Sequence, residues 1–259
     1  MYNIRIKWLT VTCFEIQLDG MTVVSDPFIT ASPNNDLTWE AIEGCDITVL
    51  SHCHWDHITD LPVLMEKFPH SLLLTGPLTA EPMMNWLDCN PSRIYPMDSD
   101  LELDFGGVKI RALFGRHTSL GMRPSELRQR FRNNPLIVAD PVMEAMQVLG
   151  TLEYRNYLIT ASDGTKILIW GNDPTPVQRA ICRALKPDIA ILQLSKQDPV
   201  EMADFAAEIG AKVVIPHHMD LSKVKEQYMP NVLKMEEEFI RRVPDGTFIC
   251  PENGKWMEL

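Results

Sequence analysis

Three of the chain's seven histidines fall between positions 52 and 57, in the segment Ser-His-Cys-His-Trp-Asp-His that begins at Ser51. Residues two apart on an extended segment point the same way, so His52 and His54 can bind one ion together. Asp56 and His57 follow a turn later and would face a neighbouring ion. Imidazole and carboxylate ligands at this density suit zinc, or manganese or iron. The spacing therefore predicts a metal centre and not a chance cluster of histidines.

Further candidate ligands come later in the chain, each at the point where an apolar run ends. His117 follows the run IRALFGR, and Asp173 follows ILIWGN. The pair His217 and His218 follows KVVIP. Because α/β sheets build their sites just past the carboxyl ends of their strands, these residues are expected to converge on the histidine segment. His70 lacks this context and is interpreted as an ordinary polar residue.

The elements that must position these residues combine strand meanders with helix–strand alternation in both halves of the chain. Alternating apolar residues predict strands over 3–9 and 12–18, and a short buried strand over 46–50 runs directly into the histidine segment. A helix-spaced apolar face follows over 58–68. With no fixed-period repeat and no Ser/Gly linker, residues 1–259 are predicted to form one α/β domain, with two sheets inside and helices outside.

Residues 118–150 break this pattern and are interpreted as an insertion, because they are irregular, interrupted by proline and mixed in polarity. Five arginines and only one acidic residue, Glu126, fall between positions 116 and 132: Arg116, Arg123, Arg128, Arg130 and Arg132. Guanidinium groups pair with carboxylate or phosphate, so one interpretation is a lid that binds a small anionic substrate. Arg116, fixed beside His117, is the best candidate, and Arg123 is another. The other interpretation is a solvated helix face.

Composition and charge narrow the class of protein. Hydrophobic residues make up 45% and charged residues 23%, as in ordinary soluble proteins. No apolar run approaches the roughly 20 residues of a membrane helix, and no signal peptide is recognisable, so a cytoplasmic location without a membrane partner is expected. The net charge of -11 argues against nucleic-acid binding. The sequence leaves the oligomeric state open, a homo-oligomer included.

The six cysteines are scattered, with no CxxC pair among them. In a chain of this length they are predicted to be buried free thiols. Cys53, which lies between two candidate ligands, is expected to point away from the metal as a buried bystander.

The order of these motifs resembles the metallo-β-lactamase superfamily: SHCHWDH, a strand-end histidine, a strand-end Gly-x-Asp and a final Ile-Pro-x-His. Within it, VVSDPF and VVIPHH resemble the branch that includes the ascorbate-6-phosphate lactonase and related metal-dependent hydrolases. The resemblance covers the chain from its first strands to about Asp220. It implies a four-layer αββα sandwich, in which two mixed sheets are covered by outer helices.

The resemblance also implies two divalent ions, zinc or manganese, and distributes the ligands between them. One ion would bind His52, His54 and His117. The other would bind Asp56, His57 and His218, with Asp173 bridging the two. His218 is preferred over His217 because the family's histidine usually stands two residues after the proline. Asp26 would orient a ligand histidine by accepting its second N–H, unless it is only a turn aspartate before proline.

Three departures from the family pattern bear on the site. Thr10 and Val11 stand where the branch often has Gly-His. The bridging Gly-Asp motif reads Gly171-Asn172-Asp173, and a neutral Asn172 in the bridging place would leave a centre for one ion. Asp173 is preferred as bridging and catalytic residue because two cations need a carboxylate between them. Ser195-Lys196-Gln197 stands where the branch tends to be Gly-rich, and Lys196 is a candidate substrate-binding residue.

The expected activity is hydrolysis of a small anionic ester or lactone, such as a sugar-phosphate lactone, by a metal-bound hydroxide. Asp56 would ligate and also orient the nucleophile or accept its proton. Two alternatives stay open: a phosphodiesterase acting on a small phosphodiester, and a non-hydrolytic metal-binding or redox role, since the fold is also used that way.

Overall fold

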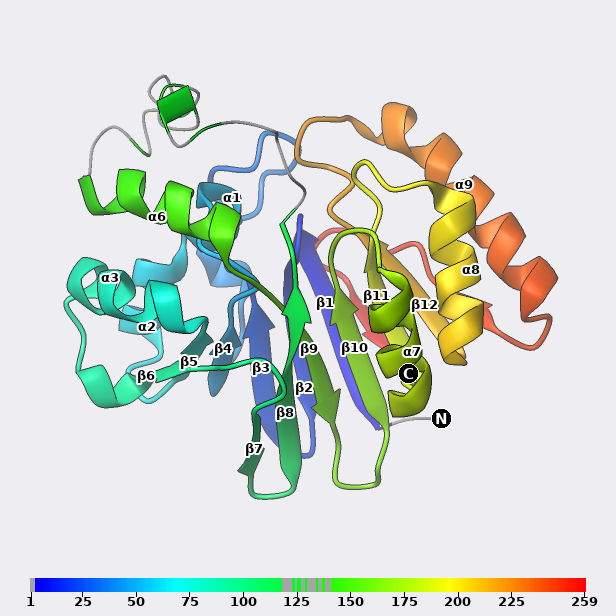
Figure 1. Ribbon diagram of the computed structural model, residues 1–259, viewed down its shortest axis with the longest axis horizontal. Helices are drawn as coiled ribbons and strands as arrows, with labels where there is room; N and C mark the ends of the chain where they lie inside the picture. Colours follow the sequence, from blue (N-terminus) through cyan, green and yellow to red (C-terminus); the bar gives the residue numbers. More distant parts are fainter. Residues whose placement is uncertain are drawn as a thin grey trace.

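Two seven-stranded sheets make up the interior of the protein, and helices cover the outer side of each (Figure 1). The computed structural model describes residues 3–117, 123, 125–126, 129, 134, 137 and 141–259. The predicted α/β architecture, with two sheets inside and helices outside, is confirmed in this part of the chain. No helix among these residues is both long enough and apolar enough to cross a membrane.

The first sheet has the strand order β14-β1-β2-β3-β4-β5-β6. Its antiparallel half joins β14, β1, β2 and β3, and its parallel half runs from β3 to β6, so the sheet is mixed. The strands span Ile4–Thr10 (β1), Cys13–Leu18 (β2), Met21–Ser25 (β3), Ile47–Val49 (β4), Leu72–Thr75 (β5), Ile94–Pro96 (β6) and Trp256–Glu258 (β14).

The second sheet has the order β13-β12-β11-β10-β9-β8-β7 and is also mixed. Strands β7 to β10 are antiparallel, whereas β10 to β13 are parallel. The strands span Glu102–Phe105 (β7), Val108–Gly115 (β8), Tyr154–Thr160 (β9), Lys166–Trp170 (β10), Ile189–Gln193 (β11), Val213–His217 (β12) and Thr247–Phe248 (β13).

The helices form the two outer layers, with α2, α3 and α6 on one side and α7, α8 and α9 on the other (Figure 1). They span Trp55–Ile58 (α1), Leu61–Lys67 (α2), Pro77–Leu87 (α3), Pro141–Leu152 (α6), Pro176–Leu185 (α7), Pro199–Ile209 (α8) and Lys225–Arg242 (α9), with short 3-10 turns at Trp39–Ala41 and Pro91–Arg93. Two of them begin at strong start signals: Thr175 and Gln178 form a capping box at the start of α7, and Asp198 caps α8.

The main core lies between the sheets and is built from their inward-facing apolar side chains. Ile6, Trp8 and Ile16 of the first sheet belong to the same buried cluster as Ile159 and Leu168 of the second. The parallel strands β11 and β12 are buried almost throughout because helices cover their other face, which explains their continuous apolar sequences.

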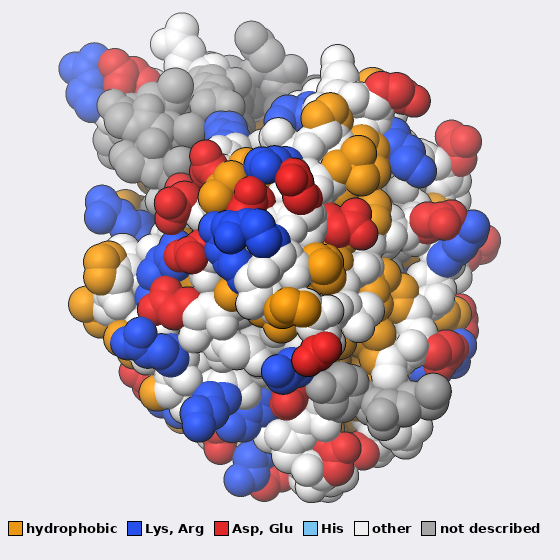
Figure 2. Space-filling view, turned by 90° about the vertical axis from the view of Figure 1, so that its right-hand side faces the viewer, with side chains coloured by type: hydrophobic (Ala, Val, Ile, Leu, Met, Phe, Trp, Pro, Cys, Tyr) orange, Lys and Arg blue, Asp and Glu red, His pale blue; other side chains and the backbone are white. Residues whose placement is uncertain are grey.

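The outer face over α8 and α9 carries charges of both signs, closely interspersed (Figure 2). Arg179 of α7 pairs there with Glu201, Asp204 and Glu208 of α8, at 3.0 to 3.2 Å. These ion pairs tie neighbouring helices together at the surface.

Two details differ from the sequence-based expectations. The helix expected over 58–68 begins only at Leu61, as α2, and Ile58 ends the separate short helix α1. Between them the backbone N–H of Asp60 donates to the Pro27 carbonyl and not to a helical partner. The expected insertion over 118–150 ends in a regular helix, α6, which continues to Leu152. Arg128, Arg130 and Arg132 lie outside the described residues.

Candidate metal centre

Two groups of three side chains converge at the carboxyl-end edge of the sheets. Within each group, one ligand atom from every residue lies within 4.8 Å of the other two. The first group is His52, His54 and His117, and the second is Asp56, His57 and His218. The groups adjoin, since the rings of His52 and His57 have centroids 4.0 Å apart. These are the two sets that the sequence resemblance implied.

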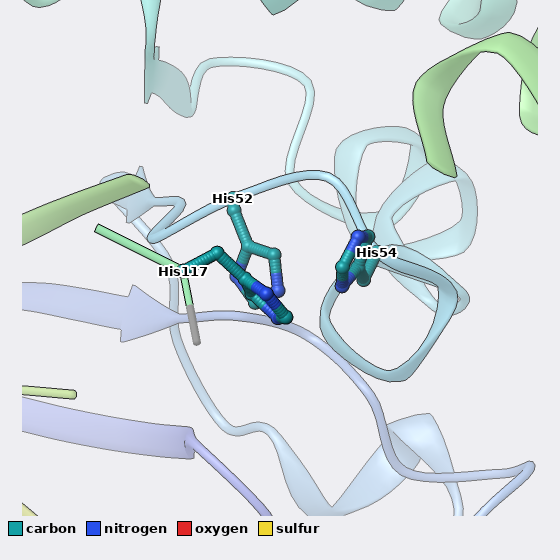
Figure 3. A group of neighbouring side chains, drawn as sticks. All are labelled: His52, His54 and His117. Carbon is teal, nitrogen blue, oxygen red and sulfur yellow. The ribbon is translucent and has the colours of Figure 1, made fainter. Parts of the chain in front are cut away.

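The first group is made by the loop after β4 and the segment after β8. His52 and His54 come from that loop, His117 follows β8, and their imidazoles turn toward one another (Figure 3). The ring centroids of His54 and His117 are 4.5 Å apart. Extended backbone before α1 places His52 and His54 on the same side, as their spacing predicted.

The second group depends on a sharp turn after β12. His218 leaves the strand with φ 57°, and its backbone N–H donates to the Val11 carbonyl at 2.8 Å. Asp220, which is buried, accepts hydrogen bonds from the Thr10 hydroxyl at 2.8 Å and the Val11 N–H at 3.0 Å. The Thr10-Val11 turn thus holds the His218 segment in place.

His217, the alternative ligand, points into the core. Its Nε2 lies 3.0 Å from the Trp170 carbonyl, and its ring packs edge-on against Phe14. The preference for His218 as the metal-facing histidine of this pair therefore agrees with the structure.

A single buried carboxylate, that of Asp26, orients one histidine in each of the two groups. The Oδ2 atom of Asp26 accepts from His57 Nδ1 at 2.8 Å and from the Ser51 hydroxyl at 2.6 Å. The Ser51 oxygen lies in turn 3.0 Å from His52 Nδ1. Both histidines are thereby held as Nδ1–H tautomers whose Nε2 atoms are the basic ones. Asp26 has the orienting position that the sequence suggested.

The Nε2 atom of His52 provides a direct test of whether these residues fit a metal ion. It is buried and has no hydrogen-bond partner among the described residues, which is costly for a polar atom unless a ligand satisfies it. His54 is oriented the other way round, because its Nε2 lies 3.0 Å from the Gln147 carbonyl and Nδ1 becomes the basic nitrogen. The donor set fits a divalent cation.

The lowered pKa values of His52, His54 and His218 also suit metal binding. Burial, reinforced by the neighbouring imidazoles, holds the pKa of His52 well below its usual range and lowers the pKa of His54 and of His218 to about 3. Burial acts in the same direction on His57, but the carboxylates of Asp26 and Asp56 outweigh it and raise its pKa. Neutral imidazole is the form that binds metals.

Asn172 lines the position between the two groups, and Asp173, the expected bridging residue, does not. A small cavity there is lined by residues of both groups together with three neutral side chains: His52, His57, His117, His218, Tyr154, Asn172 and Gln193. Asn172 is buried, whereas Asp173 is exposed. The reason is local, since Asn172 has φ 63° and this left-handed turn directs the next residue outward.

Tyr154 and Gln193 were not anticipated from the sequence. Tyr154 packs against His52 with ring centroids 4.9 Å apart, and burial raises the pKa of its phenol. It begins β9, which runs antiparallel to β8 and β10, so the start of β9 lies at the edge where its neighbours end. A search for polar residues after strands misses such a residue, and only the antiparallel pairing would have indicated it.

Helix α6 braces the histidine loop from outside. The Gln147 side chain accepts the Trp55 backbone N–H at 2.9 Å, and the Cys53 thiol donates to the Met146 carbonyl at 2.9 Å. A Cβ on Gly150 would lie 2.6 Å from Cδ2 of His54, so the helix backbone approaches this ligand closely. Cys53 is buried, as predicted, and its thiol is directed at α6. Burial raises the pKa of this thiol.

A cavity of about 450 Å³ opens beside the two groups. Its lining includes the predicted Lys196 and also Lys223, whose Nζ donates to the Ser195 carbonyl at 3.2 Å. Arg116 and Arg123 are exposed and do not belong to the lining. Arg123 pairs with Glu126 at 2.7 Å, as on a solvated surface. Among the described residues, the cationic side chains of the cavity are therefore lysines, not the expected arginines.

Comparisons with known proteins agree with this geometry. Residues 5–218 match the model of the β-lactamase superfamily domain. A UPF0173 metal-dependent hydrolase of Thermoplasma volcanium is 26% identical over 83% of this chain and 96% of its own length. One from a Geobacillus species is 23% identical over 95% of both chains. Igni18, a metallo hydrolase of Ignicoccus hospitalis, shares the fold with a TM-score of 0.67 at 14% identity, covering 98% of this chain and 97% of its own. The chain belongs to the metallo-β-lactamase superfamily.

Proposed function

We propose that the protein is a metal-dependent hydrolase acting on a small anionic ester or lactone. The observation that carries this proposal is the pair of adjoining three-residue groups, which open onto a cavity with two lysines on its wall. The two curated relatives described above are named metal-dependent hydrolases, which supports the same reaction class. Zinc or manganese is the proposed ion.

A divalent ion at the centre would supply a water whose pKa is lowered to about 7, and thus a nucleophile at neutral pH. Asp56 lines the cavity, and its Oδ2 lies 3.7 Å from Nε2 of both His57 and His218. This carboxylate is placed to hold a ligand position and to accept a proton there. Asp26 and Gln147 act behind the histidines by fixing which nitrogen faces inward.

Lys196 and Lys223 are proposed to bind the anionic group of the substrate. Both line the cavity, and an ammonium binds carboxylate or phosphate as a compact point charge. Two lysines favour an anionic ester over a neutral ester as the substrate. A phosphodiester is the second candidate substrate, because lysine binds phosphate by the same charge-assisted contacts.

The test uses matched substrates on protein stripped with EDTA and reloaded with zinc or manganese. 6-Phosphogluconolactone is compared with gluconolactone, and mono-4-nitrophenyl succinate with 4-nitrophenyl acetate. We expect metal-dependent cleavage with a higher kcat/KM for the anionic member of each pair. Absence of turnover across a broad lactone and ester panel would refute the proposal, and much faster turnover of bis(p-nitrophenyl) phosphate would replace it with a phosphodiesterase.

The lysines are tested by Lys196→Met and Lys223→Met. Loss of a charge-assisted contact is expected to raise KM for the anionic substrates about tenfold, with little change for the neutral ones. Arg123→Met is the matched control, because this exposed cation pairs with Glu126 and does not line the cavity. An equal effect of all three variants would show that the lysines have no specific role.

A further inference from the structure

We propose that Asn172 makes the centre bind two divalent ions with very unequal affinity, so that the protein holds one ion tightly and a second only weakly. The inference rests on the proposed metal centre. It concerns how many metal ions are bound and not the turnover of substrate, so the inference and the proposed function can fail separately.

The first step is the location of Asn172. It lines the small cavity together with His52 and His117 of one group and His57 and His218 of the other. It therefore lines the space that is shared by both groups. The other two lining residues, Tyr154 and Gln193, are uncharged at neutral pH.

The second step is the charge of the ligand set. Among the six candidate ligands, Asp56 provides the single carboxylate, and the other five are imidazoles. Asp26 adds one buried negative charge behind His57. Two divalent ions bring four positive charges, and their mutual repulsion is four times that of two unit charges at the same distance. The negative charge of the described residues therefore neutralises one divalent ion far better than it neutralises two.

The third step is that the surroundings of Asn172 match an amide. Its side-chain Nδ2 donates a hydrogen bond to the Arg116 carbonyl. Its backbone N–H donates to Gln193 Oε1 at 3.0 Å. A carboxylate at this position would set an oxygen without a proton against the Arg116 carbonyl oxygen, which is unfavourable. The site is therefore built around a neutral side chain at this point.

The neighbouring carboxylate does not compensate. Asp173 is exposed and belongs neither to the two ligand groups nor to the lining of either cavity. Moving it inward would require the left-handed turn at Asn172 to change, and Asn is among the few residues that adopt this conformation readily.

The experiment measures metal affinity and content. Protein stripped with EDTA is titrated with Zn²⁺ against a chromophoric chelator, and bound metal is counted by mass spectrometry after dialysis. We expect one ion per chain after dialysis and a second dissociation constant on the order of 100-fold weaker than the first. Two equally tight ions in the unaltered protein would overturn the inference.

The variants Asn172→Asp and Asp173→Asn form a matched pair, since each changes one unit of charge at adjacent positions. Asn172→Asp is expected to retain two ions after dialysis, whereas Asp173→Asn should behave like the unaltered protein. Identical stoichiometry and affinities in Asn172→Asp and the unaltered protein would count against the inference. Circular dichroism melting of both variants reports whether Asn172→Asp is folded. If this variant does not fold, the titration of the unaltered protein alone tests the inference.

Protein that binds no ion at all overturns both the inference and the proposed function, while unequal binding without turnover overturns the function alone.

Discussion

The Oδ2 atom of Asp26 lies 2.8 Å from Nδ1 of His57, and both side chains are buried. The same oxygen accepts the Ser51 hydroxyl, which in turn contacts His52 Nδ1. A single carboxylate therefore sets the tautomer of one histidine in each ligand group.

Asp26→Asn is expected to weaken metal binding at the centre by about 10- to 100-fold, because the orienting partner of His57 loses its charge. The pKa of His57 should fall at the same time, since the Asp26 carboxylate contributes to raising it. Chelator competition measures the first effect and NMR titration of the imidazole in the metal-free protein the second. Asp98→Asn is the control, because this exposed carboxylate lines neither cavity. Unchanged affinity in Asp26→Asn would show that the carboxylate serves only the fold.

Gly171→Ala is expected to lower the free energy of unfolding by about 1–3 kcal/mol through overpacking. A Cβ at this position would lie 1.8 Å from the Tyr154 hydroxyl oxygen and 2.7 Å from Gln193 Oε1. Urea unfolding measures the effect. Adding Tyr154→Phe removes the hydroxyl and should restore part of the loss, whereas simple additivity of the two changes would contradict the proposed clash.

Gln147→Leu tests the brace from α6. It leaves the Trp55 backbone N–H without its side-chain acceptor, which is expected to cost about 1–3 kcal/mol of stability. Because the same loop carries His54, metal affinity should fall as well. Glu144→Gln, on the same helix but without a hydrogen bond to this loop in the described structure, serves as control. A loss of stability without a change in metal affinity would show that this contact from α6 does not contribute to metal binding.

The stability of the metal-free protein should fall on acidification, partly because His217 is buried in its neutral form. Burial, assisted by the neighbouring imidazole of His218, lowers the pKa of His217 from 6.5 to about 3. The stabilisation is therefore complete above pH 6.5 and is lost as the pH falls toward 3. Urea unfolding of His217→Gln should show a slope against pH that is shallower by about 1.4 kcal/mol per pH unit in this window. His70→Gln is the control, since His70 is exposed, and an equal effect of both changes would rule out burial as the cause.

Much of the site could be predicted from the sequence because its signals are local. His52, His54, Asp56 and His57 lie close together in the chain. A strand-end position identified His117 and the pair His217 and His218, and the family resemblance favoured His218. The orienting role of Asp26 was implied by the family resemblance. In each case the direction of a strand determines where the following side chain goes.

The remaining features depend on geometry that spacing does not encode. The exchange of Asp173 for Asn172 follows from one backbone angle, φ 63° at Asn172, which decides which of two neighbours faces inward. Tyr154 reaches the site through the antiparallel direction of β9. Gln147 contacts residues more than ninety positions away in the chain, so its role appears only after α6 has packed against the histidine loop.

The contacts around His218 have a consequence for the order in which the molecule assembles. Its backbone is anchored to Val11, and Asp220 binds Thr10 and Val11 across 210 and 209 positions of the chain, respectively. The first histidines are synthesised long before this last ligand exists, and loop closure over such a span is slow and costly in entropy. The second ligand group is therefore completed only when the ends of the two sheets meet. A metal ion that binds it adds its binding free energy to the last stage of folding.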